Sequence, residues 1–476
     1  MQTWQLKRFY FCSFILLFIG FYIAYSQLYL GSLAIPIILF GASLFLLSLD
    51  KVMLIVVFFT PLSIKIVFGN SGINIPDEPL MIIMLFLFII KVFEQGFDKD
   101  FYRHPLTLAV TFNLFWILIT TITSSLPFVS FKFFLARFWC TVFGFFWGGL
   151  LFKDIKKIKQ YLFAFGLGLS ILVIYTTIRH AQTSFSDKKV WAMMNPFMDD
   201  HTVYGAVCSI VCTFSFVIFL YRNKATKFLD RLMAIYIGGL ALIGVILSYS
   251  RAAWLSLVFV LGFYILLKLK IRFKSLAIAL MIFLGVGLIF NGEIYQYLRF
   301  NKTTSGKSLQ GDIRSISNVK TDESNVERLN RWESGWRMFK EKPYFGFGPG
   351  TYAFKYSPYQ RAHEMTSIST TQGTMGGVHS EYFGPAVESG IIGFLSIILV
   401  FGTYLSTNMK TYYQSKNKEV KMLALAILLG LLTYFFHGLM NNFLDQDKAA
   451  IIFWGMMGMT VALSIHHKKE LNEISK

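Results

Sequence analysis

The amino-acid sequence predicts an all-α polytopic integral membrane protein with one large, partly helical loop outside the bilayer. Of the 476 residues, 55% are hydrophobic and 17% are aromatic, which is more than a soluble core can bury. Apolar runs of about 20 residues, the length that crosses the hydrocarbon core as a helix, recur along most of the chain. We therefore expect one membrane domain rather than a series of soluble domains.

These runs predict about 12 to 14 transmembrane helices. Their expected limits are 9–29, 31–49, 51–69, 78–94, 105–124, 131–152, 158–177, 198–221, 231–249, 252–269, 273–290, 381–406, 421–439 and 448–465. The chain then divides into about 11 spans in residues 1–290, an extramembrane loop in 291–380, and about 3 spans with a tail in 381–476. The first run follows Lys7 and Arg8 without a small-residue cleavage site, so we expect a membrane helix there rather than a signal peptide.

The distribution of Lys and Arg predicts the orientation, because short cytoplasmic loops retain basic residues. With the N-terminus inside, the basic segments all become cytoplasmic: these are 153–159, 221–231, 268–274, 410–421 and the C-terminal tail. The formal charge of +19 is then explained by topology and anionic lipids, and nucleic-acid binding is not expected. Both termini are expected in the cytoplasm. The polar segments are expected on the outer face: 70–79, 179–200, 248–251, 291–380 and 437–447.

The turn ILSYSRAAW places Ser250 and Arg251 between two expected spans, where the membrane meets water. The planar guanidinium of Arg251 is suited to hold a phosphate through paired hydrogen bonds. The alternative is an arginine that only anchors the end of a helix, with its charge at the membrane surface. The turn by itself leaves both roles open.

Within the long loop, VERLNRWESGWRMFKEKPYFGFGPGTYAF predicts an amphipathic helix followed by a tight turn. One apolar face is expected to rest on the membrane domain, and its residues are Leu329, Trp332, Trp336 and Phe339. Arg328 and Arg331 can lie together on another face. The glycines of GFGPG could present backbone N–H groups to an anion, although their spacing matches no nucleotide-binding loop.

His379 follows the flexible sequence GTMGG and precedes the span expected from residue 381. An imidazole can accept a proton from a sugar hydroxyl near neutral pH, so His379 is a candidate base, with a helix-capping or interfacial role as the alternative. Tyr382 lies beside it. Glu381 and Glu388 are seven residues apart and share a helix face, and at least Glu388 is expected to be buried and to need a partner.

Asp199, Asp200 and His201 could bind a divalent cation, but helix capping or hydrogen bonding to a substrate is favoured, because adjacent acidic side chains rarely point the same way. No metal site is expected. The cysteines all lie in apolar runs, which indicates neither disulfides nor zinc, and they are Cys12, Cys140, Cys208 and Cys212. Arg137 and Lys132 could add positive potential for an anionic headgroup or merely anchor a helix.

Taken in order, SYSRAAW, ERxxxWxxGWxMFxxxPxxGxGPGTY and HSEYFGPAVESGIIG resemble motifs of the O-antigen ligase and Wzy polymerase superfamily of bacterial envelope glycosyltransferases. The resemblance covers roughly residues 245–395. It implies a metal-independent, GT-C-like membrane glycosyltransferase without cofactors. The implied donor is an undecaprenyl diphosphate-linked glycan, and the acceptor is a hydroxyl of lipid A-core or of another glycan or protein. The implied location is the bacterial inner membrane, with the active site facing the periplasm.

The resemblance also implies residue roles. Arg251 corresponds to the arginine of the family's SSR-type turn, although the turn here reads Ser-Tyr-Ser-Arg. Arg328 corresponds to the arginine that opens the loop helix, with Arg331 as a competing match, and His379 to the histidine at the end of the loop. The arginines would hold the diphosphate and His379 would take the acceptor's proton. The implied supporting residues are Ser250, Tyr382, Glu388, Arg137, Asp200 and His201.

Ligase activity is the favoured expectation, but a polymerase that extends a lipid-linked glycan and a transferase that modifies protein Ser or Thr are rivals within the superfamily. A transporter of lipid-linked glycans would need broken helices with polar groups at mid-bilayer, whereas the polar residues here gather at one face. A noncatalytic lipid-binding scaffold would tolerate replacement of Arg251 and His379.

Overall fold

The computed structural model describes residues 49–68, 71–96, 98–186, 189–221, 227–269, 323–366, 369 and 376–474. Within these ranges nine helices are long and apolar enough to cross a membrane, which confirms the all-α polytopic class. The expected spans 9–29 and 273–290, and all but the last residue of 31–49, lie outside the described ranges. The nine helices are α6 (Pro105–Ile122), the continuous stretch of α7 (Pro127–Thr141), a π-helical turn (Val142–Trp147) and α8 (Gly148–Leu151), then α9 (Ile155–Ala181), α11 (His201–Leu220), α12 (Phe228–Leu247), α13 (Arg251–Lys268), α19 (Phe383–Gln414), α20 (Lys418–His437) and α21 (Asp447–Ile474).

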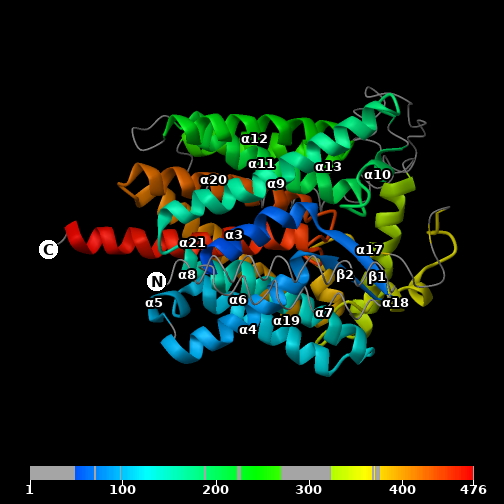
Figure 1. Ribbon diagram of the computed structural model, residues 1–476. Helices are drawn as coiled ribbons and strands as arrows, with labels where there is room; N and C mark the ends of the chain where they lie inside the picture. The colour runs from blue at the N-terminus through cyan, green and yellow to red at the C-terminus, as the bar shows by residue number, and fades with distance from the viewer. Residues whose placement is uncertain are drawn as a thin grey trace, which may run out of the picture.

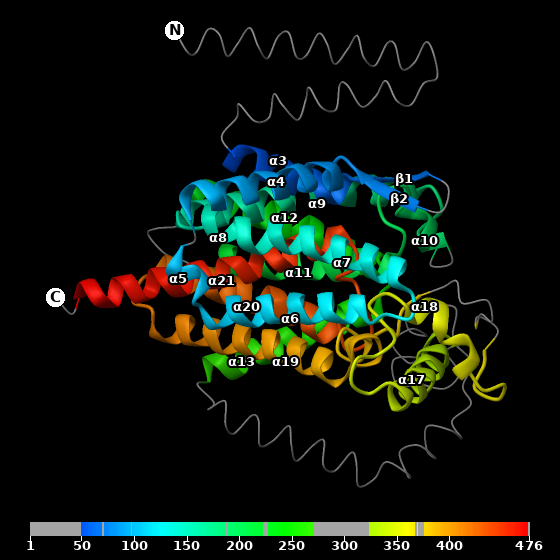
Figure 2. The ribbon, with the colours of Figure 1, turned by 90° about the horizontal axis from the view of Figure 1, so that it is seen from below.

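The long helices pack side by side into a bundle (Figures 1 and 2). Near its centre, α20 and α21 are buried along almost their whole apolar length, whereas only 33% of α12 and 28% of α13 is buried. Large hydrophobic side chains, such as Ile246, Val258 and Leu261, remain exposed on these outer helices. An apolar outer surface of this kind is suited to contact with lipid.

The span expected at residues 51–69 is wrong, because this segment contains two kinds of element. α3 (Leu49–Phe59) has only 11 residues, and a 3-10 turn (Thr60–Leu62) follows it. β1 (Ile64–Phe68) then pairs antiparallel with β2 (Ser71–Ile75), with Ile64 opposite Ile75. Pro61 disfavours continuation of the helix, and the β-branched residues of IKIVF favour a strand. The remaining elements are α4 (Asp77–Gln95), α5 (Lys99–Tyr102), α10 (Val190–Met193), α17 (Glu323–Glu341), α18 (Tyr352–Lys355) and a 3-10 turn (Ser357–Tyr359).

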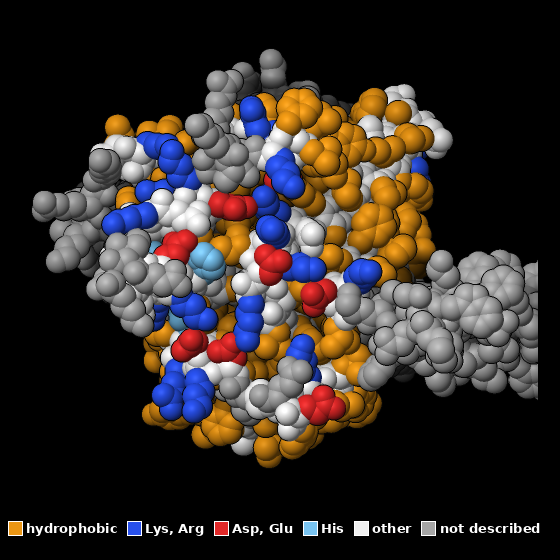
Figure 3. Space-filling model, turned by 60° about the vertical axis from the view of Figure 1, so that its left-hand side comes forward, with side chains coloured by type: hydrophobic (Ala, Val, Ile, Leu, Met, Phe, Trp, Pro, Cys, Tyr) orange, Lys and Arg blue, Asp and Glu red, His pale blue; other side chains and the backbone are white. Residues whose placement is uncertain are grey.

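The two ends of the bundle differ. α17 and the β-hairpin lie at the right-hand end in Figure 1, which we call the α17 end, and the C-terminus of α21 lies at the opposite, α21 end. Figure 3 brings the α21 end forward and shows Lys and Arg side chains gathered there between hydrophobic faces. The basic segments 153–159 and 410–421 join helices at this end, and the polar segments 248–251 and 437–447 join helices at the other. This separation agrees with the predicted topology.

Candidate active site

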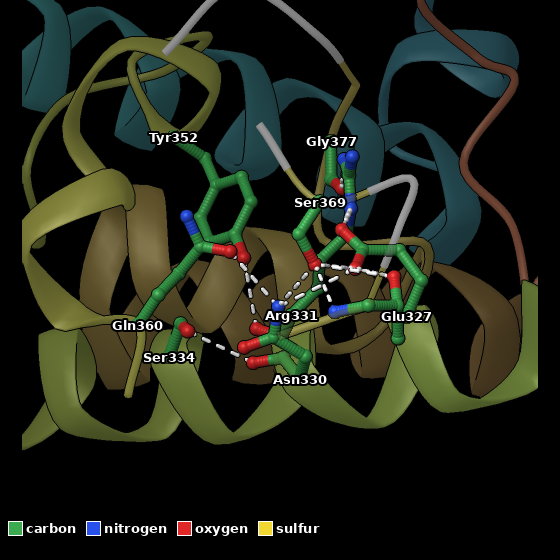
Figure 4. Close-up of polar contacts among 9 residues, drawn as sticks. Glu327, Asn330, Arg331, Ser334, Tyr352, Gln360, Ser369 and Gly377 are labelled. Carbon is green, nitrogen blue, oxygen red and sulfur yellow. Dashed lines mark hydrogen bonds and ion pairs between the residues drawn. The ribbon is translucent and has the colours of Figure 1, made fainter. Parts of the chain in front are cut away.

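Arg331 joins α17 to the segment that precedes His379. Its side chain is almost fully buried, and its Nε donates to Glu327 Oε1 at 2.9 Å, one helical turn earlier. Its Nη1 donates to the backbone oxygen of Gly377 at 3.2 Å, and the guanidinium carbon lies 5.4 Å from the ring centre of Tyr356. Figure 4 shows Arg331 together with Glu327 and Gly377. Since both members of the ion pair are buried, water screens their attraction little.

Glu327 also holds the loop that follows α17. Its Oε2 accepts hydrogen bonds from Thr366 Oγ1 at 3.0 Å and from Ser369 Oγ (Figure 4 shows Ser369). Burial raises the pKa of Glu327, but hydrogen bonds from Ser369 and Arg331 outweigh this effect and hold the pKa below its ordinary value. Glu327 therefore stays ionised and balances the charge of Arg331.

The buried face of α17 matches the one that the aromatic spacing predicts only in part. Trp336 is 45% exposed, whereas Arg331 and Met338 are buried. Gly335 lies against Phe383 of α19, where an added Cβ would come within 2.9 Å of Cε1. Two of the expected apolar residues do pack into the small core beneath α17, and these are Trp332 and Phe339. The helix is thus attached through a buried ion pair and a glycine contact as well as through apolar packing.

His379 is held from both sides along the chain. On one side, Arg331 bonds to Gly377, two residues earlier. On the other side, the carboxylate of Glu381 accepts three hydrogen bonds, from Tyr434 Oη at 2.5 Å, Phe443 N at 2.6 Å and Leu444 N at 2.8 Å. His379 itself has a φ of +57°, a left-handed conformation that is rare outside glycine and often marks functional sites. These anchors fix the backbone that carries the imidazole.

Positive charge surrounds the imidazole of His379. Burial, together with the nearby charges of Arg331 and Arg328, lowers the pKa of His379 to about 4, although Asp200 and Glu327 act in the opposite direction. The imidazole is therefore neutral at pH 7 and can accept a proton. The structure thus brings four sequence-predicted residues into electrostatic contact: His379, Arg328, Arg331 and Asp200.

A second histidine borders the same charged region. His437 ends α20, and its Nδ1 lies 3.2 Å from Asn441 Nδ2. Its Nε2 is buried and has no hydrogen-bond partner among the described residues. Arg328 and Asp200 act electrostatically on His437 as they do on His379. The sequence did not single out His437.

Asp200 and His201 fix the start of α11. The Asp200 carboxylate accepts hydrogen bonds from Thr202 N at 2.8 Å and Thr202 Oγ1 at 2.7 Å, as a helix N-cap does. His201 Nδ1 lies 2.7 Å from the backbone oxygen of Ser248 in the SYSR turn. The capping role of Asp200 is therefore confirmed. Within the described ranges, no three His, Cys, Asp or Glu side chains converge as metal ligands.

The SYSR turn packs directly on α11. Ser250 caps α13 by accepting a hydrogen bond from Ala253 N at 3.4 Å, so that Arg251 is the first residue of that helix. Gly205 of α11 permits the approach, because an added Cβ would lie 3.0 Å from Ser250 Cβ. Arg251 is half-buried at the α17 end. The N-terminus of α11, which Asp200 caps, lies at the same end.

The GFGPG turn inserts into a break in α19. Gly390 has a φ of +71° and interrupts the helix, and an added Cβ there would collide with the backbone oxygen of Tyr344. Three backbone hydrogen bonds join the two segments: Phe347 N to Val387 O at 3.2 Å, Gly348 N to Glu388 O at 2.8 Å, and Ile391 N to Pro343 O at 2.8 Å. The Glu388 carboxylate accepts a further bond from Tyr352 N at 3.0 Å. The N–H groups of Phe347 and Gly348 thus serve the fold, and the N–H of Gly350 in the same turn donates to the Glu388 carboxylate.

Arg137 and Tyr382 support the site from within the bundle. Arg137 Nη2 donates to Asp445 Oδ1 at 2.8 Å, and Tyr382 Oη donates to Phe435 O at 2.9 Å. Arg137 thus forms an ion pair inside the protein. Neither of the two roles that the sequence suggested for it, a membrane anchor or a headgroup contact, includes such a partner. A cavity of about 50 Å³ lies between Arg137, Glu388 and Asp445.

Sequence reasoning missed Glu327, Asp445 and His437 as site residues. The spacing of Glu327 and Arg331, four residues apart, is a helical ion-pair signal that could have found the first. Asp445 has no such signal, since its partner Arg137 lies 308 residues away in the chain.

Comparison with known proteins agrees with the motifs. Residues 236–398 match a family model described as O-antigen ligase, and this region includes Arg251, α17 and His379. An uncharacterized protein of Haemophilus influenzae is 24% identical over 263 residues, which cover 54% of this chain and 63% of that protein. The chain thus spans less than two thirds of the length of this relative. Residues 236–398 carry an O-antigen ligase family domain, which confirms the resemblance to the O-antigen ligase and Wzy polymerase superfamily.

Proposed function

We propose that the protein transfers a glycan from undecaprenyl diphosphate to a hydroxyl of lipid A-core, as an O-antigen ligase. The observation that carries this proposal is the position of His379, which the chain holds beside the cationic groups of Arg328 and Arg331. We place the α17 end on the periplasmic face of the inner membrane and both termini in the cytoplasm. The family domain at residues 236–398 supports a lipid-linked glycan as the donor.

Arg251 and Arg328 are assigned to the diphosphate. A guanidinium can bind phosphate oxygens through two parallel hydrogen bonds and can balance the charge that develops as the diphosphate leaves. Arg331 is assigned to positioning, because its Nε and Nη1 are bonded to Glu327 and Gly377 and its side chain is almost fully buried. Arg328 is only half-buried, on the same helix.

His379 acts as the base in a single displacement. The acceptor oxygen attacks the anomeric carbon, the bond from that carbon to the diphosphate oxygen breaks, and the electron pair leaves with undecaprenyl diphosphate. The acceptor proton passes to the imidazole of His379. A bound diphosphate offsets the charges of Arg328 and Arg331, so it raises the low pKa of His379 toward neutrality and makes the imidazole a stronger base.

Six further residues hold these groups in place. Ser250 caps α13, which begins with Arg251. Asp200 and His201 fix the start of α11. The other three connect the His379 segment to the bundle and to the GFGPG turn, and they are Tyr382, Glu388 and Arg137. None of these six residues takes part in the chemical step.

The test is an in vitro transfer assay with purified protein, an undecaprenyl diphosphate-linked glycan and lipid A-core, with and without chelator. His379→Ala should reduce transfer by about 10² to 10⁴-fold, the usual contribution of a general base. His363→Ala is the matched control, because this histidine lies in the same loop and its side chain is 75% exposed. Elongation of the lipid-linked glycan without modification of the core would instead indicate a polymerase, and full activity of His379→Ala would refute the assigned base.

A further inference from the structure

A second, larger cavity opens at the α17 end beside the β-hairpin. Its volume is about 550 Å³, within the usual range of ligand sites. The walls come from the hairpin, the start of α4, α7, and the connection from α20 to α21. Most of its lining is polar or charged, and these residues are Lys65, Asn74, Glu78, Lys132, Asp199, Asp445, Gln446, Asp447 and Lys448.

Two of its walls carry chain neighbours of residues that hold or act on the His379 segment. Asp445 lines the cavity, and the two residues before it donate their backbone N–H groups to Glu381, which stands two residues after His379. Asp199 lines it from another side and precedes Asp200, whose charge acts on His379. Asp199 and Asp445 thus connect the cavity, through their chain neighbours, to groups that hold or act on the His379 segment.

The lining suits a ligand that is rich in hydroxyl groups. It mixes ammonium groups, carboxylates and amides, unlike the arginine-rich surroundings of His379. Asn74 Nδ2 donates to both Glu78 Oε1 at 2.9 Å and Asp447 Oδ2 at 2.8 Å, which fixes these acceptors in place. At the rim, Lys65 and Asp199 form a 3.5 Å pair whose side chains are 50% and 67% exposed. Such an exposed pair is weak, so a ligand can replace it at little cost.

We infer that this cavity binds sugar residues of a glycan substrate and presents the chain to His379. Sugar hydroxyls donate to carboxylates and accept from ammonium and amide groups, so each class of lining residue has a counterpart. The inference rests on the proposed function. The sugars could belong to the acceptor core or to the donor glycan, and both present the same hydroxyl chemistry.

The test is calorimetric titration of the full-length protein with two lipid-free probes, the core oligosaccharide released from lipid A and the glycan released from its carrier. One probe should bind wild type, and Lys65→Ala should raise its Kd about tenfold, as expected for one lost hydrogen bond to a charged group. Ala136→Trp, which places an indole in the cavity wall, should abolish binding. The matched control is Lys156→Ala, an exposed lysine at the α21 end, which should bind as wild type does.

Each outcome has a distinct meaning. Binding of the core oligosaccharide alone assigns the cavity to the acceptor, and binding of the released glycan alone assigns it to the donor. Failure of both probes to bind wild type, or unchanged Kd values in both cavity variants, would overturn the inference. His379→Ala should still bind the probe although it does not transfer, so loss of the proposed chemistry and loss of the glycan site are separate results.

Discussion

Replacement of Glu327 by Ala should release α17 from the bundle. The change removes the carboxylate that pairs with Arg331 and also accepts from Thr366 and Ser369. Loss of one partner from a buried ion pair costs about 3–5 kcal/mol. Arg331 keeps its hydrogen bond to Gly377 O, which favours the lower figure of about 3 kcal/mol. The opening equilibrium of α17 should therefore rise about a hundredfold.

Hydrogen exchange of the α17 backbone amides measures this opening. Glu327→Gln keeps an acceptor for Arg331 and should show a smaller increase, and Glu333→Ala is the matched control, because Glu333 is 60% exposed on the same helix. The double variant Glu327→Leu with Arg331→Met should be less open than Glu327→Ala alone, since no charge is left buried without a partner. Wild-type exchange in Glu327→Ala would refute the reasoning that the ion pair holds α17.

Three further predictions concern the neighbouring contacts. Gly390→Ala should destabilise the protein by about 2 kcal/mol or more, because the new Cβ would collide with Tyr344 O and the backbone has a positive φ. Gly402→Ala in the same helix should not, because the space around its Cβ is open. Thermal unfolding in detergent compares the two variants. Asp445→Asn should cost about 1–2 kcal/mol in the same measurement, less than Glu327→Ala, because its side chain is 38% exposed, and an unchanged midpoint would contradict a stabilising pair with Arg137. With its pKa near 4, His379 stays neutral well below pH 6.5, so kcat/KM should hold down to about pH 5; an acidic limb centred at 6.5 would contradict this.

The sequence predicted those features whose signals are local. The spacing of aromatic and basic residues indicated α17, and the SYSR turn fell between two helices as expected. Glu388 was expected to be buried and to need a partner; it is half-buried and accepts a hydrogen bond from Tyr352 N. The hairpin at 64–75 was missed because a run of apolar residues long enough for a span outweighed Pro61 and the β-branched residues.

Most contacts that hold the His379 segment and the nearby cavity could not be predicted, because their partners lie far apart in the chain. Glu381 is held by Phe443 and Leu444, which are 62 and 63 residues away. Asn74 reaches Asp447 across 373 residues. Neither periodicity nor residue type specifies which helices pack together, and these polar bonds form only once the bundle has brought their helices side by side.

The arrangement of these contacts also determines which distances in the site can change. Arg328 and Arg331 belong to one helix, and Arg331 bonds to Gly377, so a movement of α17 carries Arg328 and the segment before His379 together. Arg251 belongs to α13, which packs against α11 and α20 in the bundle. A displacement of α17 therefore alters the distance from Arg328 to Arg251, while Glu381 keeps His379 anchored to the bundle on its other side. A diphosphate held by both Arg251 and Arg328, as proposed, would tie the loop to the bundle, so donor binding should itself protect the α17 amides from exchange.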